Sequence, residues 1–150
     1  MKKLIHLGLA LGVSLFIFGC GEPVPELPAY KPKALESQGK GITIAKSTPY
    51  NCKILGEVEG KDSTEGTQGA IRETLREGAS NDLRNTAGET VAAGKRIMLK
   101  ITKEEIKCRA KFKDGVRIVD CTNGAPQDAI SSKLLSHRMH ADVFDCGVKD

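Results

Sequence analysis

The stretch 106–122 reads Ile-Lys-Cys-Arg-Ala-Lys-Phe-Lys-Asp-Gly-Val-Arg-Ile-Val-Asp-Cys-Thr and predicts a β-hairpin. Asp114-Gly115 is the strongest short hairpin signal, and alternating apolar and polar residues flank it on both sides. If these two residues form the loop, Cys108 lies opposite Cys121 in a non-hydrogen-bonded pair, where facing side chains are closest. We therefore expect a cross-strand disulfide between Cys108 and Cys121.

The same alternation assigns the two faces of this hairpin. Phe112, Ala110 and Val119 share the face of the disulfide, so that face packs inward. The opposite face carries four cations, which we call the basic face: Lys107, Arg109, Lys111 and Lys113. It could meet lipid phosphate, peptidoglycan carboxylates or an acidic protein patch. The alternative is a solvated face whose lysines block edge-to-edge aggregation.

Upstream of the hairpin, the hydrophobic period changes to that of a helix. Apolar residues recur every four positions across 68–93, at Ile71, Leu75, Ala79, Leu83, Ala87 and Val91. This spacing predicts an amphipathic helix, with Gly78 as a point of bending and Gly94 as its stop.

Strands are predicted around this helix. Alternation indicates strands around Ile42 and Ile44, over 52–58, over 97–101 and over 141–146, with a loop over 60–69. A short helix is expected over 127–138. Together these elements predict a small α+β domain in which one main amphipathic helix packs on a mostly antiparallel sheet.

The N-terminus has the pattern of a lipoprotein signal peptide. Lys2 and Lys3 precede an apolar run that ends in Gly19-Cys20, so residues 1–19 are expected to be removed. The thiol of Cys20 is the group there that can carry a diacylglyceryl thioether, and palmitate is expected among its acyl chains. Phe18 departs from the usual cleavage motif; an ordinary cleaved signal peptide or an uncleaved anchor is the alternative.

Residues 20–40 form a proline-rich segment between this anchor and a domain over 41–150. Four prolines and scattered charges predict an extended, partly polyproline-like spacer. Gly21, rather than Asp, follows the cysteine, which resembles outer-membrane sorting. We expect a lipid-anchored outer-membrane protein whose domain faces the periplasm or the cell surface.

Composition limits the partners and indicates covalent staples. Removal of 1–19 takes away Lys2 and Lys3, which leaves 21 basic side chains against 19 acidic ones and argues against nucleic acid. The chain has no tryptophan and few aromatic residues, so its core is thin. In an oxidising compartment, four remaining cysteines predict two disulfides, and no C-x-x-C supports zinc instead. These are Cys52, Cys108, Cys121 and Cys146.

Two polar groups are candidate sites. The first lies on the predicted helix and comprises Asn81, Asp82, Arg84 and Asn85. It is either a ligand or partner site or a structural cluster that bonds the backbone of neighbouring loops. His137 and His140, with Asp142 nearby, could hold a metal on a helix, but no third ligand is placed, so we expect no metal and no cofactor.

Parts of the sequence resemble a family of short bacterial outer-membrane lipoproteins of unknown function. The resemblance rests on Cys52-Lys53-Ile54-Leu55-Gly56, on Asn-Asp-Leu-Arg-Asn at 81–85, and on Cys146. There is also a distant similarity to the lipoprotein sensor of the Rcs envelope-stress system. The resemblance implies a small disulfide-bonded α/β domain on a proline-rich tether, and it implies Cys52–Cys146 as the second bridge.

Two classes of function follow. The first is a non-enzymatic envelope lipoprotein that binds a partner protein or peptidoglycan, or relays the state of the envelope. The second is an enzyme or small-ligand binder that uses the surface of residues 81–85. The lack of a nucleophile paired with a base favours the first class.

Overall fold

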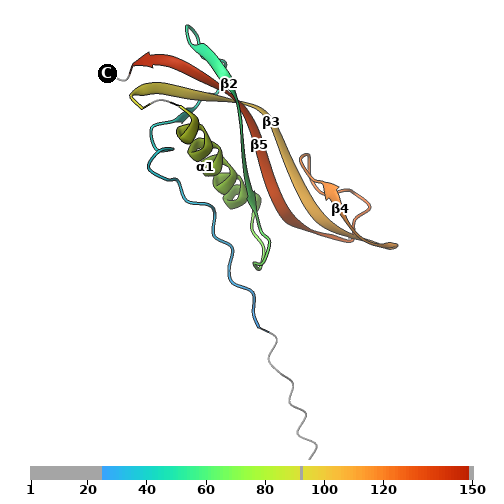
Figure 1. Ribbon diagram of the computed structural model, residues 1–150. Coiled ribbons are helices and arrows are strands. Elements are labelled where there is room, and N and C mark those ends of the chain that lie inside the picture. Colours follow the sequence, from blue (N-terminus) through green and yellow to red (C-terminus); the bar gives the residue numbers. More distant parts are fainter. Residues whose placement is uncertain (1–24, 92, 149–150) are drawn as a thin grey trace, which may run out of the picture.

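The computed structural model describes residues 25–91 and 93–148, and it places one helix against a five-stranded sheet (Figure 1). The elements in chain order are β1 (Thr43–Ile44), β2 (Lys53–Ser63), α1 (Arg72–Thr90), β3 (Lys95–Phe112), β4 (Gly115–Asp120) and β5 (Ser131–Val148).

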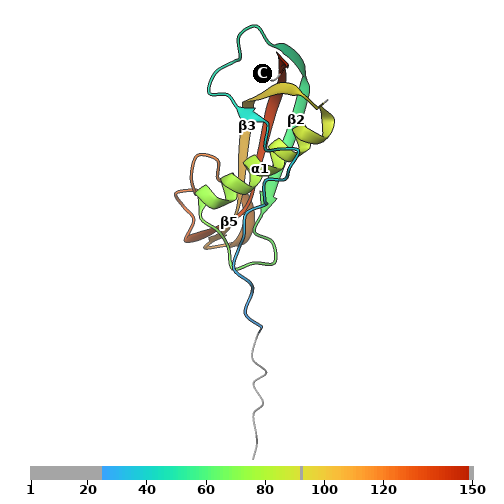
Figure 2. The same ribbon diagram turned by 90° about the vertical axis from the view of Figure 1, so that its left-hand side faces the viewer.

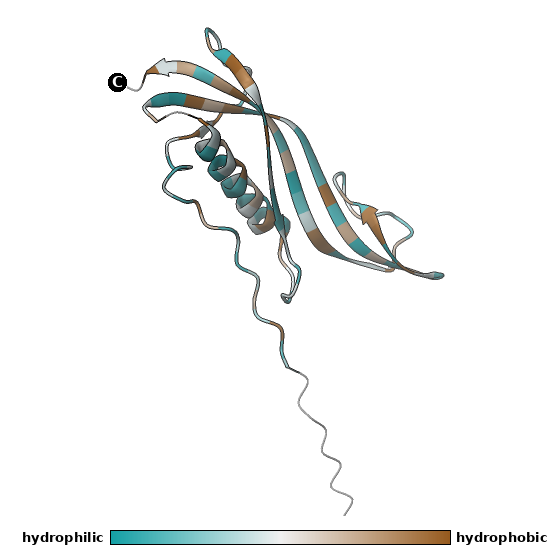
Figure 3. Ribbon diagram, viewed as in Figure 1, coloured by the Kyte–Doolittle hydropathy of each residue, from teal (hydrophilic) through white to brown (hydrophobic). Residues whose placement is uncertain are grey.

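The sheet is built around the two long strands β3 and β5. Its order is β1-β3-β5-β2, and β4 pairs with the C-terminal half of β3. Among the described strands, the short β1 runs parallel to β3, and the other pairings are antiparallel. Hydrophilic and hydrophobic residues alternate along β3 and β5 (Figure 3), as expected for strands with one buried face. The predicted α+β architecture is confirmed.

Helix α1 lies across one face of the sheet (Figure 2). Its stripe is buried as predicted at Leu75, Ala79, Leu83 and Ala87. The helix is shorter than the predicted 68–93, and Gly78 does not break it. Gly94 adopts a φ of +81° just before β3, which is the left-handed conformation that suits glycine after a helix.

The core lies between α1 and the middle of the sheet. Leu83 is fully buried against β2, where Gly60 leaves no room for a side chain between strand and helix. The core residues from the strands and the segment before β1 are aliphatic: Ile42, Ile97, Leu99, Met139, Ala141 and Val143. A second, smaller cluster surrounds the Cys108–Cys121 bridge.

The hairpin forms, but its register differs from the prediction. Phe112 pairs with Gly115, so the loop is Lys113-Asp114 and Cys108 faces Val119 rather than Cys121. The shift spans two residues, and a two-residue shift keeps every side chain on its predicted face. The backbone N–H of Cys121 donates to the carbonyl of Ile106 at 2.7 Å, which extends the pairing past β4.

Both predicted disulfides are present. Cys108 and Cys121 are diagonal neighbours with their Cα atoms 5.8 Å apart, within the usual range for a bridge. Cys52 and Cys146 join the start of β2 to the end of β5, with a Cα separation of 4.4 Å. The pairing that the family resemblance implied is therefore confirmed.

Three local predictions are wrong. The strands expected over 97–101 and 106–113 form one continuous strand, β3. The loop expected over 60–69 begins later, because Gly60 to Ser63 pair with β5. The helix expected over 127–138 is absent: β5 starts at Ser131, since a short apolar run fits either element and pairing with β3 decides between them.

Candidate functional site

Residues 30–40, which we call the strap, lie along α1 (Figure 1). The sequence predicted a free spacer up to residue 40. This is corrected by the hydrogen bonds that fix the strap to the helix and to β2. The first part of the strap is extended, as expected of a proline-containing segment, and residues 37–40 form a turn. Backbone groups of Lys33, Ala34 and Glu36 are paired with side chains of the domain.

The polar cluster on α1 holds this strap. Asn85 donates to the carbonyl of Ala34 and accepts from the N–H of Glu36, both at 2.9 Å. Asn81 donates to the carbonyl of Lys33 at 2.9 Å. Arg84 donates to the carbonyl of Ile42 at 2.9 Å, just beyond the strap. These contacts fit the structural alternative, in which the cluster bonds the backbone of neighbouring segments.

Asp82 connects the strap to β2. Its carboxylate accepts from the backbone N–H of Lys61 at 2.8 Å and pairs with the ammonium of Lys33 at 2.8 Å. Asn81 and Asn85 bond the strap, and Arg84 bonds Ile42 just after it. The cluster therefore connects α1 to the strap and to β2. Within the described residues, each of its four side chains makes at least one hydrogen bond to the strap, to Ile42 or to β2.

A buried carboxylate anchors the N-terminal end of the strap. Asp62 accepts from the hydroxyl of Tyr30 at 2.7 Å and from the N–H of Lys33 at 2.9 Å. Burial and the hydrogen bond to Asp62 raise the pKa of Tyr30, so its hydroxyl stays protonated and donates. Gly78 allows this approach, because a Cβ there would collide with the carboxylate of Asp62.

The basic face points to solvent as predicted. Lys107, Arg109, Lys111 and Lys113 are all exposed, whereas the alternating Cys108, Ala110 and Phe112 are buried. Lys107 pairs with Asp120 at 3.4 Å in an exposed contact. Among the described residues, the other three cations have no carboxylate within salt-bridge distance.

A groove of about 730 Å³ borders this face. One wall carries Arg109, Ile118 and Lys133, and the other is the loop between β2 and α1 together with Leu27. The volume lies in the range of small-molecule sites. The loop is held in place by Thr64, whose hydroxyl donates to the carbonyl of Leu134 at 2.7 Å.

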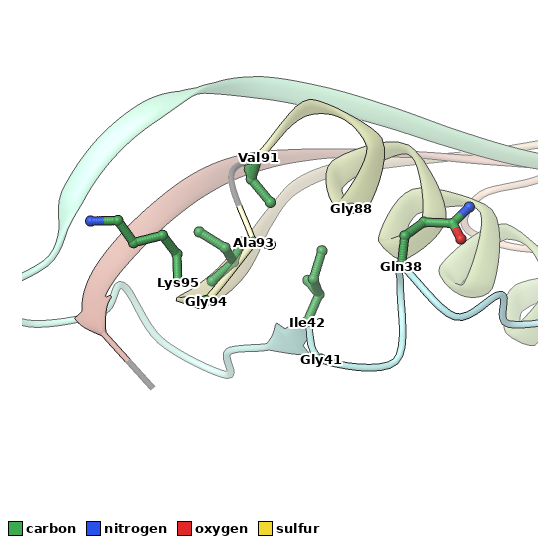
Figure 4. Close-up of a pocket in the computed structure, with 9 residues that line it drawn as sticks. Gln38, Gly41, Ile42, Gly88, Val91, Ala93, Gly94 and Lys95 are labelled. Atoms are coloured by element: carbon green, nitrogen blue, oxygen red, sulfur yellow. The ribbon is translucent and has the colours of Figure 1, made fainter. Parts of the chain in front are cut away.

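A smaller pocket of about 180 Å³ lies where the strap passes the C-terminal end of α1. Ile42 and Val91 point into it from opposite sides, and the amine of Lys95 is directed away (Figure 4). That amine pairs with Asp145 at 3.1 Å. The pocket therefore brings no pair of titratable groups together.

The buried side chain of His137 belongs to a hydrogen-bonded network with Glu104 and Arg76. Its side chain is 1% exposed, and Nε2 lies 2.8 Å from the carboxylate of Glu104. Glu104 also pairs with Arg76 of α1 at 2.9 Å. Burial lowers the pKa of His137, and the hydrogen bond to Glu104 partly opposes this; Arg76 lowers the pKa of Glu104.

His137 and His140 do not share a face. They lie three positions apart on a strand, so their side chains point to opposite sides of the sheet. His140 lies 3.8 Å from Glu105 on the other face. In the part of the chain that the structure describes, no three histidine, cysteine, aspartate or glutamate side chains converge as metal ligands would.

Comparison with known proteins places the chain in a family. The family model described as Domain of unknown function (DUF4156) matches residues 33–146. The chain belongs to the DUF4156 family. The match begins within the strap and ends at Cys146, so the segment that docks on α1 is largely part of the DUF4156 domain. Neither the curated proteins nor the solved structures yielded a match.

The anchor region is not placed by these observations. Gly19, Cys20 and Gly21 lie outside the described residues. Within 25–91 and 93–148, no helix has the length and hydrophobicity needed to span a bilayer.

Sequence reasoning missed two residues. Lys133 is the cross-strand partner of Arg109, but the predicted helix over 127–138 removed it from the basic face. Tyr30 was assigned to the spacer, so its bond to Asp62 was not anticipated. A lone tyrosine among prolines was the one signal that this segment could pack.

Proposed function

We propose that this chain is a bacterial outer-membrane lipoprotein, anchored through Cys20, whose domain is a non-enzymatic binding or sensing module for an acidic surface of the envelope. The Gly19-Cys20 junction and Gly21 support the anchor and its sorting. The observation that carries the binding role is the basic face, now extended by Lys133. Its exposed cations lie on adjacent strands, and apart from Lys107, which pairs with Asp120, they have no acidic partner among the described residues.

The alternative, an enzyme or ligand binder that uses residues 81–85, has less support. The polar groups of Asn81, Asp82 and Asn85 are engaged with the strap and with β2. A substrate would have to displace the strap before it reached them. We therefore place the binding role on the basic face.

The strap shortens the free tether. Between Cys20 and Tyr30, about ten residues can extend by roughly 3 Å each in a polyproline conformation. The proposed anchor therefore holds the domain within roughly 30 Å of its membrane. A partner that fits this geometry lies on or near the membrane surface.

Two experiments test the proposal. Cys20→Ala should leave the precursor unprocessed or mislocalised, and normal processing with membrane fractionation would contradict the anchor. Reversal of Lys107, Arg109, Lys111 and Lys113 to glutamate should leave folding intact and weaken crosslinks to partners in intact cells. A matched control reverses four exposed lysines elsewhere: Lys31, Lys40, Lys46 and Lys53.

The control separates a local site from a general effect of net charge. If both reversals weaken the same crosslinks, the basic face has no specific role. If neither changes any crosslink, that face is a solvated surface, and the binding role proposed for it fails.

A further inference from the structure

Positive charge is concentrated in one part of the domain. Residues 107–133 contain six lysine and arginine side chains against three acidic ones, whereas the rest of the mature chain is close to neutral. We call this part the arm: β4 and the segments of β3 and β5 that pair beside it. In Figure 1 the arm extends away from α1. A local excess of charge of this kind favours contact with an anionic surface.

One row of side chains crosses the arm. Arg109 on β3 is the partner of Ile118 on β4 and of Lys133 on β5, so the three side chains share a face. Within the described residues, neither Arg109 nor Lys133 has a carboxylate within salt-bridge distance. In the next row Lys111 lies beside Val116. Arg109 and Lys111 therefore each have an aliphatic neighbour on the outer strand β4.

The aliphatic neighbours are open to solvent. Val116 is 61% exposed and Ile118 is 64% exposed, and part of β4 has the brown of hydrophobic residues in Figure 3. Exposed aliphatic side chains beside free cations are typical of surfaces that lie in the headgroup region of a membrane. The cations meet phosphate there, while the aliphatic groups reach the boundary with the acyl chains.

The groove beside Arg109 lies where the chain leaves the domain. Leu27 lines it and is 53% exposed. The N–H of Gln68 donates to the carbonyl of Pro28 at 3.0 Å. This bond holds the N-terminal end of the described chain beside the loop between β2 and α1. Two acids, Glu26 and Glu65, line the groove on the exit side, and Glu26 accepts from Gln68 at 3.1 Å.

The geometry points to a membrane-binding surface: the arm binds the phosphate headgroups of the anionic leaflet in which the chain is anchored. Arg109, Lys111 and Lys133 contact the phosphates, and Ile118 lies at the boundary with the acyl chains. This inference rests on the proposed function, because it needs the anchor at Cys20. About seven residues separate Cys20 from Leu27, which corresponds to roughly 20 Å of extended chain.

The chain contains no tryptophan, so a single introduced tryptophan is a unique fluorescent probe. The purified lipidated protein carrying Ile118→Trp would be reconstituted in phosphatidylcholine vesicles with or without phosphatidylglycerol. With phosphatidylglycerol, we expect blue-shifted emission and quenching by brominated lipid. Val116→Trp is a second probe in case Ile118→Trp does not fold. Ile54→Trp is the control. Ile54 lies at the start of β2 and is 56% exposed, so a tryptophan there should stay water-exposed.

Neutralising the cations should release the arm. Each lysine or arginine near an anionic surface contributes about 1 kcal/mol, so changing Arg109, Lys111 and Lys133 to glutamine should lower the ratio of bound to free arm on the order of 100-fold. Lys40, Lys46 and Lys53 changed to glutamine form the matched control and should have little effect. Added salt should release the wild-type arm as well.

The outcomes separate this inference from the proposed function. If the protein floats with the vesicles but the tryptophan at 118 or 116 stays water-exposed with phosphatidylglycerol, the membrane-binding arm is wrong and the anchor stands. If crosslinks to a protein in cells depend on the basic face while vesicles leave the tryptophan unchanged, the arm binds an acidic protein. If the protein does not float with any vesicle, the anchor itself fails.

Discussion

Replacing Asn85 with alanine should loosen the strap from α1. Asn85 is 7% exposed, and its side-chain amide makes both a donor contact to Ala34 and an acceptor contact to Glu36. Alanine can make neither contact. The change therefore removes two hydrogen bonds between the helix and the strap while leaving the apolar stripe of α1 intact.

The magnitude follows from these two bonds. A net contribution of about 1 kcal/mol per hydrogen bond gives about 2 kcal/mol, and a partly buried N–H of Glu36 left unpaired adds up to about 1 kcal/mol more. Asn81 makes one bond to the strap from a more exposed position, so Asn81→Ala should cost about 1 kcal/mol or less. The difference between the two variants is the quantity to test.

Equilibrium unfolding in guanidinium chloride, with both disulfides intact, measures the free energies. Limited digestion with trypsin reports on the strap itself, because Lys33 and Lys40 lie in it. We expect faster cleavage at Lys33 in Asn85→Ala than in Asn81→Ala. Equal free energies of unfolding and equal cleavage rates for the two variants would refute the role assigned to Asn85.

Three further predictions concern other parts of the fold. Gly78→Ala should lower the melting temperature, because the new Cβ meets Asp62, although alanine in a helix normally stabilises by about 1 kcal/mol; a higher melting temperature would contradict the packing. Replacing Cys108 and Cys121 together with serine should lower the free energy of unfolding by about 3 kcal/mol, and replacing Cys52 and Cys146 should lower it by about 4–5 kcal/mol. The second loss is larger because that bridge closes a longer loop. The reverse order in denaturant unfolding would contradict this. Burial lowers the pKa of His137 below its ordinary 6.5, so the unfolded chain takes up a proton first as the pH falls, and the free energy of unfolding should decrease below about pH 6.5. A further decrease should follow below about pH 4.5, as Glu104 is protonated. Unfolding measured at a series of pH values should show that His137→Gln removes the first decrease only.

The elements whose apolar residues recur at a regular spacing could be predicted from the sequence. The stripe from Leu75 to Ala87 is buried as expected, because tertiary packing selects the apolar face that the sequence already presents. The faces of the hairpin were also predicted, although its register was not. Asp114-Gly115 signals a turn, but pairing of Phe112 with Gly115 keeps the same faces, and the alternation alone does not distinguish the two registers.

Contacts made by backbone groups could not be predicted in the same way. The strap binds through carbonyl and N–H groups of Lys33, Ala34 and Glu36, which every residue carries and which leave no pattern in the sequence. The cluster of residues 81–85 was noticed because its side chains are polar. What those side chains bond became apparent only from the position of the strap.

The Cys52–Cys146 bridge has a mechanical consequence for the strap. It encloses β2, α1, β3, β4 and most of β5 in one covalent ring, while residues 25–51 lie outside that ring. A pulling force applied at residue 25 would load the contacts of Tyr30, Ala34 and Glu36 one after another, so they would peel in sequence rather than break together. If the chain is held at its C-terminal end, the force beyond β1 passes from Cys52 through the disulfide bond to Cys146, so the helix and the hairpin stay unloaded.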